Sequence, residues 1–229
     1  MKIAIISDIH SNAIALKEIL NEIEKRKIKQ IYCCGDIIGY ASMPNECIKE
    51  LVKHNIKSIY GNHEYALLHN EALSWFNYNA IKALLWHKEN LKRFAWEWIK
   101  RLKERRIIKA SGKKIMFVHG SPDDCFEYVW PSTSDEIFEY WLNKYNIDVL
   151  VLGHTHLPFI RKIKNKLVIN PGSVGQPRDG NNKASFALLD LKNMNAKIIR
   201  VSYDIDAIAQ DIKAKGLPHI FADRLYLGK

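Results

Sequence analysis

Three short segments with strand character near the start of the chain each stop at residues that can bind metal. They end at Asp8 with His10, at Asp36, and at Asn62 with His63. Apolar, β-branched runs of this length are typical of strands that are buried on both faces. A carboxylate at the end of such a strand is costly to desolvate unless a cation meets it. We therefore expect the fold to gather these strand ends around metal, with Asp36 at the centre.

The sequence before residue 64 alternates between strand and helix patterns. We expect strands over 2–6, 28–34 and 56–60, a helix that follows a cap at Ser11 or Asn12, and a second helix over 44–54. Strands that alternate with helices predict a largely parallel sheet, whose functional groups lie at the carboxyl ends of the strands.

The pattern changes after residue 64. Residues 65–106 form one long stretch with helical spacing, and later helices are expected over 134–145 and 206–215, before a tail over 216–229. Strands are expected over 107–110, 114–119, 148–153, 158–163, 166–170, 184–190 and 196–203. The short polar turn at 164–166 predicts antiparallel pairing of the strands beside it. We expect one domain over 1–229, with two sheets, one mostly parallel and one mixed, helices outside them and the helical insertion at 65–106.

The aromatic residues of the helical insertion allow more than one interpretation. Residues 91–102 keep the spacing of a buried helix seam, which favours packing over a base-stacking surface. The insertion directly follows a polar strand end, so we expect part of it to cap the site. Trp75, Phe76 and Trp86 are also candidates for an interface between copies of the chain, and self-association stays open.

The positive charge of the chain is concentrated in one segment. The net charge is +10, and residues 82–114 carry twelve Lys and Arg against three Glu. Weak contact with nucleic acid through a basic helix is one interpretation of this surplus. A solvated, lysine-rich helix face is the other.

No part of the sequence has the pattern of a membrane span or a signal peptide. A span needs about 18 or more consecutive apolar residues, and the first residues lead straight into Ser7-Asp8-Ile9-His10. We expect a soluble, cytoplasmic protein without membrane contact.

Histidines supply a second argument for metal binding. Five of the nine stand at strand ends beside other ligand types, namely His10, His63, His119, His154 and His156. Asp8 and His10 are two residues apart, so on an extended backbone both side chains leave the same face and can bind one ion. His154 and His156 repeat this spacing. Imidazole, carboxylate and amide ligands without thiolates suit manganese, iron, zinc, nickel or cobalt, and ligand type alone does not choose among them.

Five short motifs, in order along the chain, resemble the calcineurin-like metallophosphoesterases. They are Asp8-x-His10, Gly35-Asp36, Gly61-Asn62-His63-Glu64, Val118-His119-Gly120 and Gly153-His154-Thr155-His156. The run from Pro171 to Arg178 is similar to that of the small predicted phosphodiesterases of bacteria and archaea in this superfamily. The resemblance implies an α/β fold, a four-layer αββα sandwich of two mixed sheets, with the helical insertion as a cap.

The resemblance also implies two divalent metal ions. One would be held by Asp8, His10, Asp36 and His156, and the other by Asp36, Asn62, His119 and His154. Manganese is the first expectation, with nickel, cobalt, iron or zinc as alternatives. The implied reaction is attack on phosphorus by a hydroxide that bridges the ions. His63 would protonate the leaving oxygen or stabilise charge in the transition state.

One departure from the family pattern bears on the substrate. In the protein serine/threonine phosphatases of this superfamily, an aspartate that pairs with the catalytic histidine and a phosphate-binding arginine follow the Gly-Asp motif. Gly39 and Tyr40 stand at these positions, which disfavours protein phosphatase activity. We expect Arg178 to contact phosphate, with Tyr40 as a second substrate contact, although Arg178 also fits a simple surface role.

The preferred function is hydrolysis of small nucleotide-like or organic phosphodiesters. A nuclease is one alternative, favoured only by the basic segment 82–114. A phosphomonoesterase or a dinucleoside polyphosphate hydrolase is another. A non-catalytic scaffold, like the retromer subunit with this fold, is least favoured because that protein lacks the catalytic histidine and His63 is present here.

Overall fold

The apolar runs of the sequence form the strands of two five-stranded sheets. A computed structural model describes residues 1–229. The first sheet contains, in spatial order, β10 (Asn195–Val201), β9 (Ala184–Asp190), β1 (Lys2–Ile6), β2 (Ile31–Cys33) and β3 (Lys57–Ser58). The second contains β4 (Arg106–Ala110), β5 (Lys113–Phe117), β6 (Val149–Val151), β8 (Lys166–Asn170) and β7 (Phe159–Ile163).

Both sheets mix parallel and antiparallel pairs. In the first sheet, β1, β2 and β3 run parallel, whereas β9 is antiparallel to β1 and to β10. In the second, β5, β6 and β8 run parallel between the antiparallel edge strands β4 and β7. The hairpin expected around residues 164–166 is confirmed. The expectation of one mostly parallel sheet is wrong, because a strand pair from the end of the chain returns onto β1.

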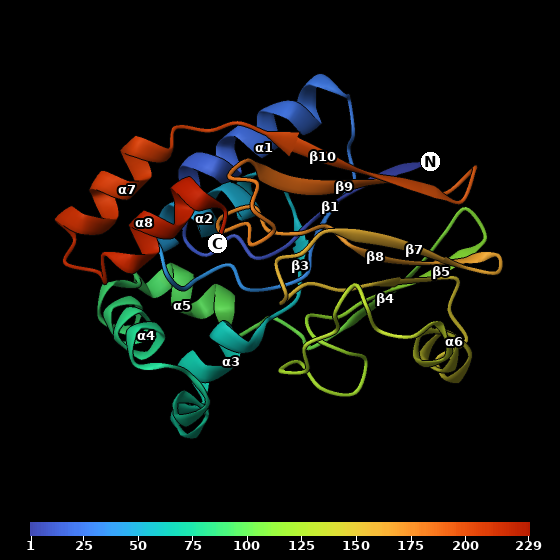
Figure 1. The fold of residues 1–229 in the computed structure, drawn as a ribbon, viewed down its shortest axis with the longest axis horizontal. Helices are drawn as coiled ribbons and strands as arrows, with labels where there is room; N and C mark the ends of the chain where they lie inside the picture. Colours follow the sequence, from blue (N-terminus) through green and yellow to red (C-terminus); the bar gives the residue numbers. More distant parts are fainter.

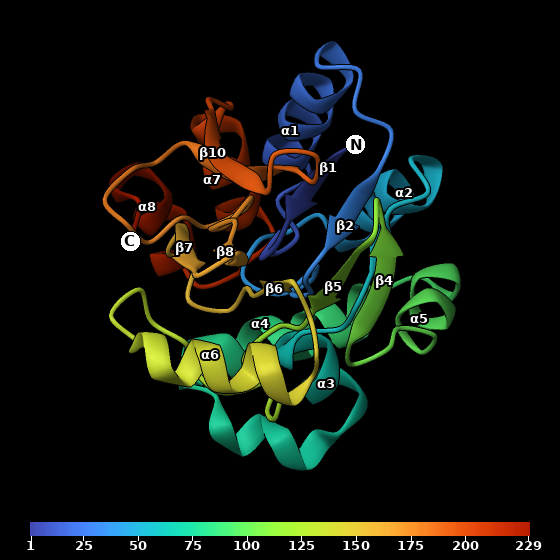
Figure 2. The same ribbon diagram turned by 90° about the vertical axis from the view of Figure 1, so that its right-hand side faces the viewer.

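Alternating residues of the strands fill three separate layers of core. In β1, Ile3 and Ile5 face the second sheet, whereas Ala4 and Ile6 face the helices on the outside. A third core lies between the second sheet and its own covering helix. Figure 2 shows α1 and α6 on opposite outer sides of the strands. The αββα sandwich is therefore confirmed.

The covering helices follow the expected amphipathic spacing. They are α1 (Ala13–Lys25) and α2 (Pro44–Lys53) on the first sheet, α6 (Asp135–Lys144) on the second, and α7 (Ile205–Ala214) and α8 (Ile220–Leu227) at the end of the chain. The Asn12 side-chain oxygen accepts the N–H of Ala15 at 3.0 Å and caps α1. Figure 1 shows α7 and α8 grouped with α4 at one end of the molecule, and their buried faces share a core with Ala83.

The insertion at 65–106 is not one helical stretch. It consists of α3 (Asn62–Leu68), the 3-10 helix η1 (Asn70–Trp75), α4 (Tyr78–Asn90) and α5 (Arg93–Ile99). A new helix starts at Asn77, whose side-chain oxygen accepts the N–H of Ala80 at 3.0 Å. The helix ends before Leu91, where the oxygen of the distant Asn45 side chain accepts the N–H of Lys92 at 2.8 Å. These caps explain the breaks that helical spacing alone did not predict.

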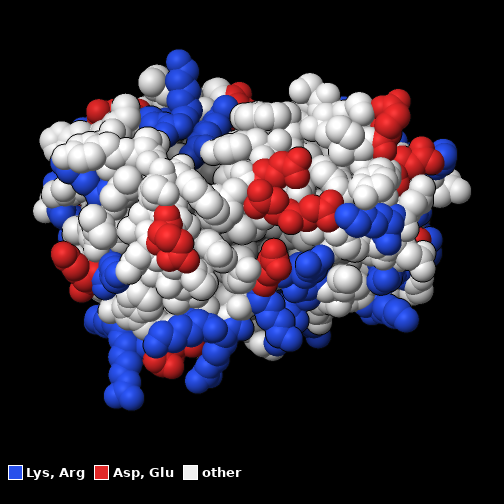
Figure 3. Space-filling model, turned by 90° about the horizontal axis from the view of Figure 1, so that it is seen from below, with Lys and Arg blue, Asp and Glu red and all other residues white.

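The basic segment 82–114 is not a single helix either. It runs through α4, α5 and β4 into the start of β5. On the face drawn in Figure 3, Lys and Arg gather along the lower margin while Asp and Glu form a group near the middle. No helix of the protein is both long enough and apolar enough to span a membrane.

The core between the sheets provides a test of the fold. Phe117 is buried and its ring stacks on Tyr32 at 4.6 Å between ring centroids. Phe117→Ala removes this packing and should lower the free energy of unfolding in urea by about 3–5 kcal/mol. Phe94→Ala, at a ring that is 40% exposed, is the control and should cost about 1 kcal/mol or less. Equal losses in both variants would contradict the assigned core.

Candidate metal centre

The predicted ligands lie together at the ends of five strands. Asp8 follows β1, Asp36 follows β2, Asn62 begins α3 after β3, and His119 follows β5. His154 and His156 lie in the turn after β6. All of these side chains are buried. The strand ends therefore converge as the sequence predicts.

The backbone at these ligands differs from the expected extended form. Positive φ values occur at Asp8 (54°), His10 (46°), Asp36 (50°), His154 (67°) and His156 (61°). Residues with side chains adopt this left-handed conformation at a cost, and such strain is concentrated at functional sites. The pairs Asp8–His10 and His154–His156 still meet, but they do so through tight turns rather than along strands.

One group of ligand atoms surrounds Asp8. The Nε2 atoms of His10 and His156 are 3.0 Å apart, and His156 Nε2 lies 3.4 Å from Asp8 Oδ1. The Oδ2 atom of Asp36 lies 3.6 Å from His10 Nε2. Four nitrogen and oxygen donors thus point toward one small volume.

A second group shares the same oxygen of Asp36. Asp36 Oδ2 lies 3.2 Å from His119 Nε2. The side-chain oxygen of Asn62 lies 3.0 Å from this Oδ2, 3.0 Å from His119 Nε2 and 3.2 Å from His154 Nδ1. An amide oxygen that faces only lone-pair atoms has no hydrogen-bond donor, which is the environment of a carbonyl ligand to a cation.

Hydrogen bonds to the backbone hold the four imidazoles in place. His10, His119 and His156 donate from Nδ1 to the carbonyls of Ile38 (3.0 Å), Cys34 (2.7 Å) and Gln176 (2.5 Å), and His154 donates from Nε2 to Phe126 (3.1 Å). When a ring is neutral, its other nitrogen carries a lone pair that faces the cluster. Metal-binding histidines use this arrangement to fix the tautomer.

Burial and mutual charge control the ionisation of the cluster. Burial raises the pKa of Asp8 to about 7 and lowers that of His154 to about 3. Burial also lowers the pKa of His10 and His156 well below the ordinary range, which favours neutral, ligating rings. At His119 burial acts in the same direction, but the Asp36 carboxylate outweighs it and raises the pKa to about 9. Asp36 is thus the negative centre of the cluster.

The chemistry of these side chains suits a transition metal ion. In three groups of residues the potential ligand atoms lie within 4.8 Å of one another, and these groups are Asp8–His10–His156, His10–Asp36–His63 and Asp36–His119–His154. Nitrogen and carboxylate donors without thiolates suit such ions. The clusters can therefore hold metal ions.

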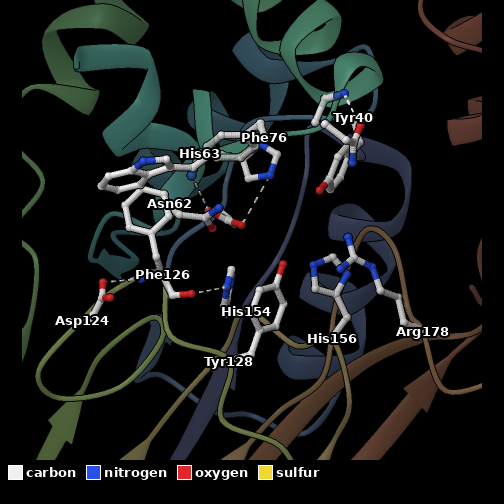
Figure 4. Close-up of a pocket in the computed structure, with 14 residues that line it drawn as sticks. Tyr40, Asn62, His63, Phe76, Asp124, Phe126, Tyr128, His154, His156 and Arg178 are labelled. Carbon is white, nitrogen blue, oxygen red and sulfur yellow. Dashed lines mark hydrogen bonds and ion pairs between the residues drawn. The ribbon is translucent and has the colours of Figure 1, made fainter. Parts of the chain in front are cut away.

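A pocket of about 380 Å³ opens directly over this cluster. Its lining consists of Asp36, Tyr40, Asn62, His63, Trp75, Phe76, Asn77, Ala80, Asp124, Phe126, Tyr128, His154, His156 and Arg178. Figure 4 shows Tyr40, His156 and Arg178 on one side, with Phe126 and Asp124 on the other. The cap expected from the insertion is present, because Trp75, Phe76 and Asn77 line the pocket.

Comparison with known proteins decides the family. A sequence model of the calcineurin-like phosphoesterase superfamily domain matches residues 1–194. The chain belongs to the calcineurin-like phosphoesterase superfamily. The resemblance inferred from the five motifs is confirmed.

Individual relatives agree with this assignment. The chain is 39% identical to an uncharacterised protein of Methanocaldococcus jannaschii, over 99% of this chain and 98% of that protein. It is 24% identical to a phosphodiesterase of the same organism, over 75% of this chain and 83% of the relative. The crystal structure of a metallophosphoesterase from Sphaerobacter thermophilus matches with a TM-score of 0.85 at 28% identity, covering 100% of this chain and 99% of that one.

In this phosphoesterase no carboxylate orients His63. Its Nδ1 atom is buried without a hydrogen-bond partner, and Gly39 fills the adjacent space. A Cβ atom on Gly39 would lie 2.2 Å from His63 Nδ1, and Gly39 has a φ of 104°. The aspartate of the protein phosphatases therefore does not fit here. The ring of His63 packs edge-on against Tyr40 (4.7 Å) and Phe76 (5.0 Å) between ring centroids.

Arg178 and Tyr40, which are predicted from the sequence as substrate contacts, lie together in the pocket lining. The guanidinium of Arg178 lies over the Tyr40 ring, 5.6 Å from its centroid. Gln176 Oε1 accepts hydrogen bonds from Arg178 Nε (3.3 Å) and Nη2 (3.0 Å). Tyr40 in turn packs on Phe221 of α8, with 4.8 Å between ring centroids.

Glu64 is a residue of this phosphoesterase that sequence reasoning did not single out. Its buried carboxylate accepts four backbone N–H groups, those of Gly61 (2.8 Å), Asp36 (2.9 Å), Ile37 (2.8 Å) and Ile38 (2.9 Å). Burial raises its pKa to about 7, and the neighbouring Asp36 adds to this. A glutamate three residues after the start of a helix was the available signal, since it is typical of a capping box.

His87 was also not identified from the sequence as a residue that supports the site. Its side chain extends from α4 and contacts the loop that contains Gly39. Its Nδ1 donates to the carbonyl of Ala83 (2.5 Å), and its Nε2 accepts from the Ser11 hydroxyl (2.8 Å) and the Gly39 N–H (3.3 Å). A lone histidine on a helix carries no sequence signal for this role.

The four hydrogen bonds of Glu64 lead to a stability prediction. In Glu64→Gln an NH₂ group replaces one oxygen and faces backbone N–H donors, so buried donors lose their acceptor. We expect the free energy of unfolding in urea to fall by at least about 2 kcal/mol. Calorimetric titration with Mn²⁺ should also show weaker binding, because Asp36 loses its support.

Glu71→Gln is the matched control for this prediction. Its side chain is 77% exposed, so stability and Mn²⁺ binding should not change. If Glu64→Gln is as stable as the wild type, the Glu64 carboxylate does not hold the turn after β2 against the start of α3.

Proposed function

We propose that this phosphoesterase is a phosphodiesterase that uses two divalent transition metal ions to hydrolyse small nucleotide-like or organic phosphodiesters. The observation that carries the proposal is the convergence of six candidate ligand side chains on the two sides of Asp36 at the base of the pocket. Its volume of about 380 Å³ is at the small end of the range for small-molecule sites. This size favours small esters over a nucleic-acid duplex.

Each ion has its own set of candidate ligands. One set is Asp8, His10, Asp36 and His156, and the other is Asp36, Asn62, His119 and His154. The bridging role of Asp36 is supported by its Oδ2, which lies 3.6 Å from His10 Nε2 and 3.2 Å from His119 Nε2. Its other oxygen accepts the backbone N–H of His63 at 3.0 Å. The carboxylate is therefore held in position from outside the two sets.

The donor atoms indicate the chemistry of the site. When bound, a pair of divalent ions lowers the pKa of water and stabilises charge on phosphate oxygens. Manganese is our first choice, and nickel, cobalt, iron and zinc accept the same donors.

His63 and Arg178 supply the remaining groups that the reaction requires. His63 Nε2 lies 3.9 Å from Asp36 Oδ2, so its ring faces the ligand cluster from the pocket side. We assign it to protonation of the leaving oxygen. Arg178 binds a phosphate oxygen while Tyr40 supports its guanidinium.

Weak contact of segment 82–114 with nucleic acid, self-association and cytoplasmic localisation stay predictions.

The first test is metal-dependent hydrolysis of a simple diester. Protein loaded with Mn²⁺ should hydrolyse bis-p-nitrophenyl phosphate, lose this activity in EDTA and regain it with fresh Mn²⁺. Activity on the monoester p-nitrophenyl phosphate alone would instead favour a phosphomonoesterase. The enzyme proposal fails if the diester, the monoester and dinucleoside polyphosphates all stay intact with manganese, nickel, cobalt and zinc.

The second test separates the role of His63 from metal binding. His63→Ala keeps the backbone N–H that holds Asp36, so elemental analysis should find unchanged metal content. Turnover of the diester should fall by about 10²- to 10⁴-fold, the usual contribution of a proton donor.

His69→Ala, at a side chain that is 48% exposed, is the control for the second test and should match wild type. Loss of metal in His63→Ala would show that His63 is a ligand rather than a proton donor.

A further inference from the structure

The pocket has two chemically different ends. At one end the Arg178 guanidinium lies over Tyr40, 5.6 Å from the ring centroid. At the other end Trp75 and Phe126 form the wall, with Asp124 beside them. Figure 4 shows Phe126 and Asp124 across the pocket from Arg178. A symmetrical small diester would not need this difference.

Trp75 is not part of the core. Its side chain is 66% exposed, although a tryptophan on a packing seam is normally covered. The ring is nonetheless supported, because it stands at 87° to Phe126 with 4.6 Å between ring centroids. A large apolar ring that lines a pocket, exposed but supported, is suited to contact a flat ligand.

The aromatic end continues to the reaction centre. Phe126 contacts Phe76 at 6.3 Å between ring centroids, and Phe76 contacts His63 at 5.0 Å. A group at Trp75 is thus connected by side chains in contact to the residue that we assign to proton transfer. The two ends and the ligand cluster belong to one continuous surface.

Charge determines which part of a substrate each end accepts. The Asp124 carboxylate is exposed, and its Oδ1 accepts the N–H of Phe126 at 2.8 Å. A carboxylate repels phosphate, whereas its second oxygen can accept a hydrogen bond from an amino group on a ring. Phosphate is therefore directed toward the ligand cluster and Arg178, and the aromatic end receives an uncharged ring.

We propose that Trp75, Phe126 and Asp124 form a subsite for a nucleobase, so that the substrates are nucleoside phosphodiesters. The placement of the phosphate rests on the proposed function, whereas the base contact does not. The base stacks on Trp75, and the phosphate lies over the ligand cluster.

The test compares two ligands that differ only in the base. Binding of adenosine 5′-monophosphate and of ribose 5-phosphate to the Mn²⁺-loaded protein is measured by calorimetry. The nucleotide should bind about 5- to 100-fold more tightly, the range that stacking of one base on an aromatic side chain supplies. Equal binding of the two ligands to wild type would overturn the subsite.

Variants locate the base contact. Trp75→Ala should reduce the difference between the two ligands to about 2-fold or less, and Trp75→Phe, which keeps a ring, should retain part of it. Tyr78→Ala is the control, because Tyr78 is 70% exposed and lies outside the pocket. A full difference in Trp75→Ala would overturn the proposal, as would a change of oligomeric state in this variant without an effect on nucleotide binding.

The same experiment separates this proposal from the phosphodiesterase activity. If bis-p-nitrophenyl phosphate is not hydrolysed but the base still strengthens binding through Trp75, the proposed activity fails and the subsite stands. If the diester is hydrolysed and the base adds nothing, the subsite fails and the activity stands.

Discussion

The site depends on one buried carboxylate that binds no substrate. Glu64 accepts backbone N–H groups from the turn after β2 and from the start of α3, four in all. A buried charge is stable only when hydrogen bonds compensate for lost water. These four bonds satisfy that condition, and they also fix the distance between Asp36 and Asn62. The shared position of Asp36 between two groups of histidines follows from this connection.

The rest of the fold provides the rigidity that the strained ligands require. Left-handed conformations at five candidate ligand residues persist only where the surroundings leave no alternative. Three core layers hold the strands whose ends carry these residues. Backbone carbonyls then orient each imidazole. The centre is thus determined by main-chain geometry as much as by the identity of its side chains.

Local sequence patterns predicted the parts of the structure that depend on local rules. The alternation of strands and helices and the polar strand ends correctly placed Asp8, Asp36 and His119 at the ends of strands. The patterns failed where distant segments decide the outcome. The first sheet is mixed because β9, from late in the chain, pairs antiparallel with β1. Helix α4 ends where the side chain of Asn45, about fifty residues earlier in the sequence, accepts a hydrogen bond from the N–H of Lys92. Three of the four hydrogen-bond partners of Glu64 lie in the turn after β2, and His87 contacts the distant Ser11 and Gly39. Local patterns do not reveal these long-range contacts.

The contact of Tyr40 with Phe221 has a consequence for the order in which the site matures. The predicted ligands lie within residues 8–156, and the match to the superfamily domain ends at residue 194. Yet the ring that supports Tyr40 comes from α8, which begins at Ile220. During synthesis α8 leaves the ribosome after all of the segments that carry the predicted ligands. The candidate ligand cluster can therefore assemble on a nascent chain before Phe221 is available to support Tyr40.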